Sequence, residues 1–477
     1  MIKDEKWPVA RLIPISSASG VEAQERRLAS ALLAVMSSVP EFGYALLKPL
    51  GAPVGKIETF IEVPFKMGDR AIRPDGVITV TRAGKSWSAI VEAKVASNQL
   101  DAAQMNTYLD LARELEFQAV LSISNQYVTS STDYPIEIDG RKLRRTKLHH
   151  WSWIDLLTVA IVEKEYRGIG DPDQAYILGE LIRYLSDPRS GAVAFDGMGP
   201  SWVAVRDGAR EQTLRKTDPA VLAVAARWDD LVRYLGLSLT SELGREVKPA
   251  LAAAEKTSAA RRQALIDSLA STGRLYGDLQ IPNVTSPLSV IADLRSRQII
   301  ASTSIDAPKE GTSRGRVSWM LRQLQGAPDN VKVEAKAAYR STPIAAPLSA
   351  VREDPSVIYP EAGREIRVFI LSLSSNAGLK RDDSRGSFVE SVVSATERFY
   401  GEVLQKLRAW KAAPPKLKKS GEQEETPAET VADILGIEPT QIGEVQSPGE
   451  SRGLELPPPD PDVADEPSAP TQGPPGT

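Results

Sequence analysis

The chain has 477 residues, of which 25% are charged and 42% hydrophobic, and its formal net charge is −4. This length exceeds one ordinary hydrophobic core, so we expect two or three domains. The absence of cysteine excludes disulfides and thiolate metal sites, and only two histidines, His149 and His150, are present. A histidine-based metal cluster is therefore not expected. No GxxxxGK[ST] motif occurs, so energy-dependent activity would need a partner chain.

Targeting signals are not evident in the sequence. The opening residues, Met-Ile-Lys-Asp-Glu-Lys-Trp-Pro, lack the pattern of a signal peptide, and no apolar run reaches the length needed to cross a membrane. Together with the absence of cysteine, this leads us to expect a cytoplasmic protein with no membrane partner.

The first predicted element is a helix over residues 19–39, with Ser19 as its N-cap. Glu25 lies at helical spacing from Leu28, which directs it toward the core. Glu22 is an alternative inward acid, although its spacing from Ser19 also fits a capping box. Simple surface charge is a third interpretation of both glutamates.

Two strands follow, predicted over residues 76–82 and 87–95 from their β-branched and apolar residues. The turn signal at Ala83-Gly84 makes them a hairpin. In that register Asp75 lies opposite Glu92, and a turn one residue longer still leaves the aspartate beside the next position. The sequence therefore predicts two carboxylates close together at the open end of the hairpin.

The second strand carries charge where a buried strand is expected to be apolar. Glu92 and Lys94 share one face because side chains alternate along a strand. A buried Glu–Lys pair, or an edge strand with one wet face, would explain these two residues alone. The opposed Asp75 adds a second acid to the same place, and this favours a functional site.

Paired carboxylates of this kind favour a magnesium centre. Two carboxylates within a few ångströms repel each other unless a cation lies between them, and Mg²⁺ prefers oxygen ligands. Asp75 and Glu92, helped by the backbone carbonyl of Ala93, are the expected metal ligands. Lys94 is expected to orient or deprotonate an attacking water and to offset charge on a phosphate. The combination suits hydrolysis of a phosphodiester.

A helix is predicted next, over residues 100–115, and a further strand over residues 117–124. Gln104 and Tyr108 lie one helical turn apart on one face of that helix. A glutamine and a tyrosine at this spacing are common, and Tyr108 also fits a core position.

In these segments the chain resembles the PD-(D/E)xK nuclease superfamily. Pro74-Asp75 matches the first half of its motif, and Glu92-Ala93-Lys94 matches the second half. Gln104 and Tyr108 resemble the QxxxY motif of the RecB-like and lambda-exonuclease-like branches. The resemblance covers roughly residues 15–165, about a third of the chain.

The resemblance implies a restriction-endonuclease-like α-β-β-β-α-β core and a Mg²⁺-dependent nuclease, with Mn²⁺ as a possible substitute. It implies that Glu25 is an accessory acid and that Gln104 and Tyr108 position the substrate. The implied substrate is a nucleic acid, with DNA expected, and such domains occur in DNA repair, restriction and phage defence. The alternative is a catalytically silent nucleic-acid-binding or scaffold protein on the same fold.

The whole chain is predicted to be an α/β protein in four parts. These are a nuclease-like domain (1–195), a helical connector (196–272), an α/β module of unknown function (273–411) and a disordered tail rich in proline and glutamate (412–477). A long helix or helical hairpin is expected over residues 241–271. Partner proteins and homo-oligomers remain open possibilities for the second half.

Charge is divided unevenly along the chain. From Ser420 onward there are 13 acidic residues against one basic residue, Arg452, so this segment carries −12 and the preceding residues carry +8. A mildly basic body suits a phosphate-backbone partner. A basic cluster between predicted elements is a candidate contact for DNA phosphates or a plain surface loop: Arg141, Lys142, Arg144, Arg145 and Lys147. The acidic tail is either a solvated linker, a DNA-mimicking brake or a protein-docking segment.

Overall fold

The computed structural model describes residues 7–13, 20–96, 98–126, 134–192, 195, 197–338, 342–361, 364–380 and 386–411. Ser19, the expected N-cap of the first helix, and the acidic tail over residues 412–477 lie outside the described residues. The described parts are mixed helix and sheet, which confirms the predicted α/β class.

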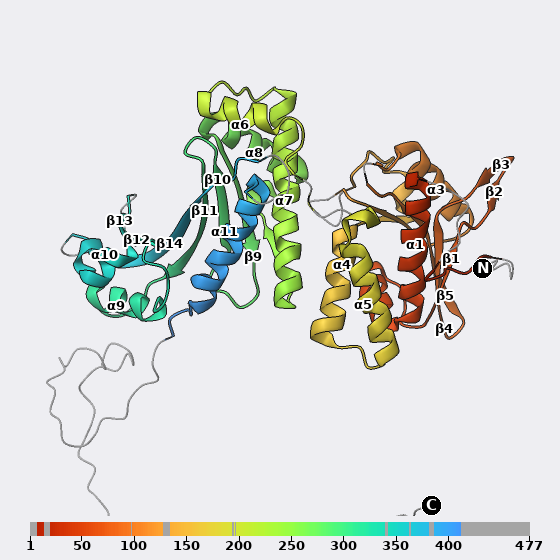
Figure 1. Cartoon of the computed structure of the whole chain (residues 1–477), viewed down its shortest axis with the longest axis horizontal. Helices are drawn as coiled ribbons and strands as arrows, with labels where there is room; N and C mark the ends of the chain where they lie inside the picture. Colours follow the sequence, from red (N-terminus) through yellow and green to blue (C-terminus); the bar gives the residue numbers. More distant parts are fainter. Residues whose placement is uncertain are drawn as a thin grey trace, which may run out of the picture. The chain divides into compact units, whose positions relative to one another are not determined.

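A five-stranded mixed sheet organises the first part of the chain (Figure 1). Its strand order is β1 (Lys56–Ile61), β4 (Gly76–Arg82), β5 (Lys85–Ala93), β6 (Ala119–Ser124) and β7 (Lys147–Ser152). The first three strands are antiparallel, whereas β5, β6 and β7 are parallel. Helix α1 (Gly20–Ser38) precedes β1, and α3 (Ala102–Glu114) connects β5 to β6.

The hairpin of β4 and β5 has the predicted register. Gly76 pairs with Val91 at the open end of the hairpin, so Asp75, one residue earlier, lies level with Glu92. The turn residues Ala83 and Gly84 have φ values of 45° and 78°, as a two-residue hairpin turn of this hand requires. Local sequence therefore determines where the two carboxylates meet.

Strand β5 is apolar on both faces because helices cover both sides of the sheet. Ala89, Val91 and Ala93 belong to a hydrophobic cluster with α1, α4 (Trp153–Ile161) and α5 (Pro172–Ser186). On the other face, Ile90 belongs to a cluster that includes Met105 of α3. The charged residues at the end of β5 thus emerge from the centre of a covered sheet.

Helix α1 continues into a second helix, α2 (Pro40–Leu47), after a sharp bend. Among the described residues no single helix is both long and apolar enough to cross a membrane. Only the bent pair Gly20–Ser38 and Pro40–Leu50 passes that test, with an angle of 106° between its two helices. Much of this pair is buried in the first cluster, as Leu32, Phe42 and Leu46 illustrate.

The second part of the chain forms a seven-stranded antiparallel sheet. Its order is β13 (Ile344–Pro347), β12 (Lys332–Ala337), β14 (Ile366–Asn376), β11 (Gln298–Asp306), β10 (Leu288–Asp293), β9 (Arg274–Gln280) and β8 (Lys248–Ala250). Burial alternates along β11, so one face of the sheet carries the core. Two helices, α9 (Ser313–Gln323) and α10 (Leu348–Glu353), lie in the connections near β12.

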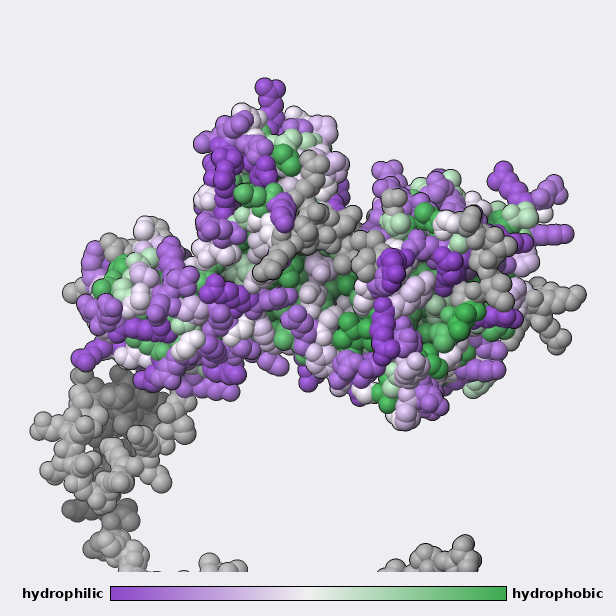
Figure 2. Space-filling model, in the orientation of Figure 1, coloured by the Kyte–Doolittle hydropathy of each residue, from purple (hydrophilic) through white to green (hydrophobic). Residues whose placement is uncertain are grey.

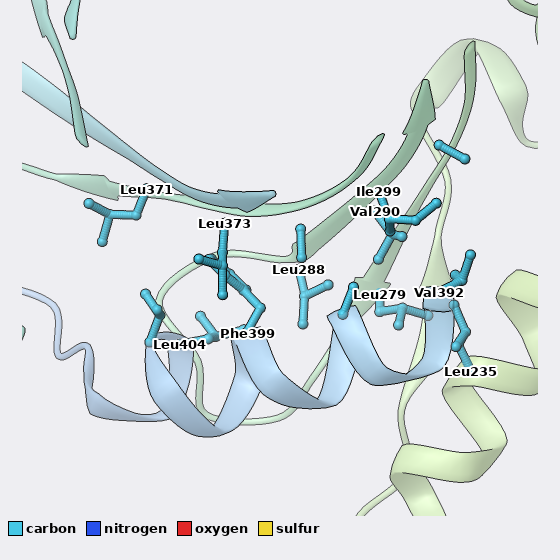
Figure 3. Close-up of a cluster of buried hydrophobic side chains, with 14 of the residues drawn as sticks. Leu235, Leu279, Leu288, Val290, Ile299, Leu371, Leu373, Val392, Phe399 and Leu404 are labelled. Atoms are coloured by element: carbon cyan, nitrogen blue, oxygen red, sulfur yellow. The ribbon is translucent and has the colours of Figure 1, made fainter. Parts of the chain in front are cut away.

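Four further helices contribute to this core: α6 (Trp202–Glu211), α7 (Pro219–Leu243), α8 (Ser258–Thr272) and α11 (Phe388–Glu402). Figure 3 shows side chains of α11, such as Val392 and Phe399, facing side chains of the sheet, such as Leu288 and Leu373. The buried residues that form this single cluster come from segments between Phe195 and Leu407. Residues 196–272, expected as a connector, therefore bury their apolar side chains in the same core as the later strands.

The expected helix over residues 241–271 is wrong in its extent. Helix α7 ends at Leu243, where Gly244 adopts a left-handed φ of 62° and caps the helix. Strand β8, which contains Pro249, follows before α8 begins at Ser258. Glycine and proline ended the first helix despite the alanine-rich sequence beyond them.

Candidate active site at the end of strand β5

Charged side chains from α1 and β5 meet where β5 ends. The Lys94 Nζ atom lies 2.7 Å from Glu92 Oε1 and 3.9 Å from Glu25 Oε2. The Glu25 and Glu92 side chains are 9% and 2% exposed, and Lys94 is 18% exposed. Three of the residues singled out from sequence are thus brought together in a largely buried position.

Asp75 lies beside this group at the start of β4. The Ala93 N–H donates a 2.8 Å hydrogen bond to Asp75 Oδ2. The N–H and C=O of one strand residue point to the same neighbour, so the Ala93 carbonyl faces the Asp75 side of β5. The backbone N–H of Glu62 donates to the Asp75 carbonyl at 3.2 Å, which fixes the chain on its other side.

The choice between the two glutamates of α1 is clear from their surroundings. Glu25 accepts hydrogen bonds from the Val95 N–H at 3.3 Å and from Asn98 Nδ2 at 2.7 Å. Glu22 is instead exposed and pairs with Arg26 one turn away. Glu25 is therefore the α1 carboxylate at the site, and Glu22 belongs to the surface.

Helix α3 brings Gln104 and Tyr108 to the same place. Asp101 caps the helix by accepting from the Gln104 N–H at 2.7 Å. Gln104 Nε2 donates to the Tyr108 hydroxyl at 2.9 Å, and that hydroxyl interacts with Glu92. Tyr108 is 4% exposed, so its ring is a core residue while its hydroxyl reaches the charged group.

The electrostatics of the group follow from burial of excess negative charge. Burial, reinforced by repulsion from Glu92, raises the pKa of Asp75 from 3.8 to about 8. Burial opposes the charge on Lys94, but attraction to Glu92 and to the other acids outweighs it and raises the Lys94 pKa. Burial and the neighbouring Glu92 also raise the pKa of Tyr108. Near neutral pH the site holds a charged lysine and a protonated Asp75.

Residues distant in sequence hold the β5 end in place, and sequence reasoning missed them. Trp153 Nε1 donates to the Lys94 carbonyl at 2.8 Å, and the Lys94 N–H donates to the Ile123 carbonyl at 2.8 Å. The Ala96 N–H donates to the carbonyl of Gly191, whose φ of 83° suits glycine. No local sequence pattern predicts these contacts, because each joins segments that are far apart in the chain.

Gly76 allows helix α1 to approach the site closely. A Cβ atom at this position would lie 2.4 Å from Leu33 Cδ1 of α1. The absence of a side chain therefore lets the helix that carries Glu25 pack against the start of β4, next to Asp75.

A polar row continues from Glu92 across the parallel strands. Ser122 of β6 is the register partner of Glu92, and His150 of β7 is the register partner of Ser122. The serine Oγ lies 2.9 Å from His150 Nδ1, and His150 Nε2 lies 2.9 Å from the Gln126 carbonyl. Burial lowers the pKa of His150, so the ring is neutral near pH 7. His150 thus has a structural role: its ring links β6 to the Gln126 carbonyl beside the site.

The donor set fits a magnesium ion in kind and number. Among the described residues no group of three His, Cys, Asp or Glu side chains is arranged to hold a metal by itself. Mg²⁺ usually binds through one or two carboxylates and keeps several waters. Asp75 and Glu92, which repel each other as the raised Asp75 pKa records, supply that number, and the Ala93 carbonyl faces the same side.

Comparisons with known proteins assign no family to this chain. The scan against protein-family models and the searches of curated proteins and of solved structures find no match to this chain.

Proposed function

We propose that this protein is a Mg²⁺-dependent nuclease of the PD-(D/E)xK type, which hydrolyses phosphodiester bonds in DNA. The observation that carries the proposal is the convergence of Asp75, Glu92 and Lys94 at the end of a central strand, with Glu25 beside them. When only the strands of the five-stranded sheet are counted, α1 is followed by β1, β4 and β5 and then by α3 and β6, with α2 and a separate short hairpin inserted; this is the order that the resemblance implies. Burying three acids around one lysine is costly, and a fold has no need of it.

Each residue has a role that its position supports. Asp75 and Glu92, with the Ala93 carbonyl, would hold Mg²⁺, which when bound supplies Lewis-acid activation of phosphate and water. The raised pKa of Lys94 keeps its ammonium group charged. Lys94 therefore orients the attacking water and offsets negative charge on the phosphate, rather than removing a proton.

The remaining residues position these groups. Glu25 accepts hydrogen bonds from the segment that follows Lys94 and so sets the lysine's position. Tyr108 and Gln104 place polar atoms beside Glu92 on the α3 side, where a substrate backbone would be recognised. Water attacks phosphorus in line, the bond from phosphorus to the 3′ oxygen breaks, and the products carry a 5′-phosphate and a 3′-hydroxyl.

A catalytically silent nucleic-acid-binding protein is the second candidate. The observation that favours it is the 2.7 Å ion pair between Lys94 and Glu92, which neutralises one of the two metal-binding carboxylates. In that case the cluster is a structural ion pair that tolerates two further acids, Asp75 and Glu25, and nucleic acid binds without being cut.

The test is cleavage of linear duplex, circular duplex and single-stranded DNA by purified full-length protein, with Mg²⁺, Mn²⁺ or EDTA. Asp75→Ala and Lys94→Ala are compared with wild type after circular dichroism has shown that each is folded. Metal-dependent cutting that both variants lose, with 5′-phosphate product ends, would support the proposal. Binding of DNA by folded wild type without any cutting would favour the silent alternative.

A further inference from the structure

A short basic hairpin projects from the sheet just before Asp75 (Figure 1). It consists of β2 (Phe65–Met67) and β3 (Arg70–Ile72), paired antiparallel. Its cations Lys66 and Arg70 are exposed, and so is Arg73, which follows it. Within the described residues none of the three forms an ion pair. Figure 2 shows hydrophilic side chains standing out from this end of the molecule.

The root of this hairpin is fixed beside the candidate active site. Phe65 and Ile72 are buried in the hydrophobic cluster that contains Met105 and Tyr108 of α3. The Phe65 and Phe117 rings make an edge contact with centroids 6.3 Å apart. Buried aromatic and aliphatic anchors therefore support a charged tip, which is an arrangement suited to a contact surface.

A second basic segment packs on the same helix. Lys142 donates to the Asn106 carbonyl at 3.1 Å and pairs with Asp110 at 2.5 Å, which ties this segment to α3. Leu143 packs against the same hydrophobic cluster as the hairpin root. The three cations that follow are exposed and make no ion pair among the described residues: Arg144, Arg145 and Lys147.

We infer that the hairpin cations and the Arg144–Lys147 cations bind the phosphate backbone of a double-stranded DNA beside the bond to be cut. This inference rests on the proposed function, because the candidate active site defines where that bond lies. Arg70 precedes Asp75 by five residues, so an extended chain carries it at most ~17 Å from the site. That reach equals about half a turn of B-form DNA.

The surface suits a duplex better than a single strand. Proteins that bind single strands stack bases on exposed aromatic side chains. Among the described residues the exposed aromatic side chains are Tyr166 and Tyr176, which lie after α4 and in α5 rather than on the hairpin or α3. The six cations form no ion pair among the described residues, and no exposed aromatic side chain is described beside them, so they suit the charge of a regular backbone.

The test measures binding separately from cutting. Anisotropy of a labelled 30-base-pair duplex is followed in EDTA over a range of salt concentrations, with full-length protein. The hairpin variant carries Lys66→Gln, Arg70→Gln and Arg73→Gln, and the second variant carries Arg144→Gln, Arg145→Gln and Lys147→Gln. A matched control carries three neutralised exposed cations from the second part of the chain: Lys256→Gln, Arg314→Gln and Lys336→Gln.

Each test variant is expected to weaken duplex binding about tenfold or more near 0.1 M salt and to reduce the salt slope by about 2–3, since each lost phosphate contact removes about 0.9. The control variant is expected to bind as wild type does. Unchanged affinity and slope in the hairpin variant would overturn the inference, as would tighter binding, which would mean that the acidic tail occupies this surface. Preference for a single strand of equal length would also overturn it.

Failure of the proposed function would look different. Wild-type protein that binds duplex through these cations yet never cuts it, with any metal, would contradict the nuclease proposal and leave the contact surface standing. Wild-type protein that cuts DNA while the hairpin variant binds normally would contradict only the contact surface.

Discussion

Two of the buried charge clusters among the described residues differ in how their carboxylates contact a cation. In the second part of the chain, Arg261 is 3% exposed and bonds Asp229 at 3.0 Å and Glu255 at 2.6 Å. Its guanidinium also lies over the Tyr276 ring, 4.8 Å from the centroid, and donates to the Tyr276 carbonyl. The fork of one arginine thus joins α7, α8 and β9.

In the cluster at the end of β5, by contrast, not every carboxylate contacts the cation. One lysine faces Glu25 and Glu92, while Asp75 receives its side-chain hydrogen bond from the backbone of Ala93. The raised pKa of Asp75 indicates that this carboxylate lacks a compensating cation. The comparison teaches that a buried ion network holds a fold when each of its carboxylates contacts the cation, and points to chemistry when a carboxylate such as Asp75 has no ion pair among the described residues.

The largest expected effect separates the two kinds of carboxylate. Asp75→Asn is expected to lower Mg²⁺-dependent cleavage by at least about 10³-fold, or about 4 kcal/mol, because a metal ligand is lost. Asp293→Asn removes a buried carboxylate that pairs with Arg274 outside the site, and cleavage should stay near wild type. The measurement is the single-turnover rate on duplex DNA. Equal losses in the two variants would contradict the assignment of Asp75 to an active site.

The Arg261 cluster should respond in stability rather than in activity. Arg261→Met leaves Asp229 and Glu255 without their cation, which should cost about 3–5 kcal/mol of unfolding free energy. Urea unfolding monitored by tryptophan fluorescence measures this loss. Lys94→Met, its counterpart in the other cluster, should abolish cleavage. An Arg261→Met protein as stable as wild type would show that the Arg261 network does not hold the fold.

Gly76 links packing to the site. Gly76→Ala should cost about 1–3 kcal/mol and slow cleavage, because the added Cβ meets Leu33 and displaces α1 with Glu25. Gly170→Ala is the control, since its Cβ would meet nothing within 4 Å. Thermal unfolding and cleavage are measured on both. A Gly76→Ala protein that matches the control would mean that α1 does not set the geometry of the site.

The excess charge should also appear as a pH dependence of stability. The Asp75 pKa is about 8 in the folded protein and 3.8 without the fold's influence, so the folded state holds an extra proton between these values. Stability therefore falls as pH rises through this window. In EDTA, the Tm of Asp75→Asn relative to that of wild type should rise by a few degrees from pH 4 to pH 8. Mg²⁺ should reduce this difference in Tm. A gap independent of pH would contradict the raised pKa.

The smallest effect concerns the turn that sets the register. Ala83 has a φ of 45°, which costs an L residue about 1–2 kcal/mol. Ala83→Asn should recover about 0.5–1 kcal/mol, because asparagine followed by glycine suits this turn. Gly84→Ala, at a φ of 78°, should lose stability instead. Chemical denaturation of the two variants checks these opposite signs.

The features of the fold that could be predicted from the sequence are those that depend on residues close together in the chain. The register that opposes Asp75 to Glu92 follows from a two-residue turn and β-branched strands, and Glu25 follows from helical spacing. The contact of Trp153 with the Lys94 carbonyl joins residues 59 positions apart, and no local pattern encodes it. The shared core of residues 196–272 and the later strands could not be predicted for the same reason, since burial in one core depends on tertiary packing.

The break after α7 is a different case. Gly244 and Pro249 were stop signals in the sequence, but the alanine-rich residues around them favoured a longer helix. Here the backbone preferences of two residues outweighed the average propensity of their surroundings.

The measurement that tests the central claim most directly is the binding of Mn²⁺ to the full-length protein, followed by electron paramagnetic resonance with and without an uncleavable phosphorothioate duplex. Wild type should take up Mn²⁺, more tightly with the duplex present, and Mg²⁺ should displace it. Asp75→Asn should lose this binding, whereas Asp293→Asn should keep it. Equal Mn²⁺ binding by wild type and Asp75→Asn would contradict the claim that the cluster at the end of β5 is a metal-dependent active site.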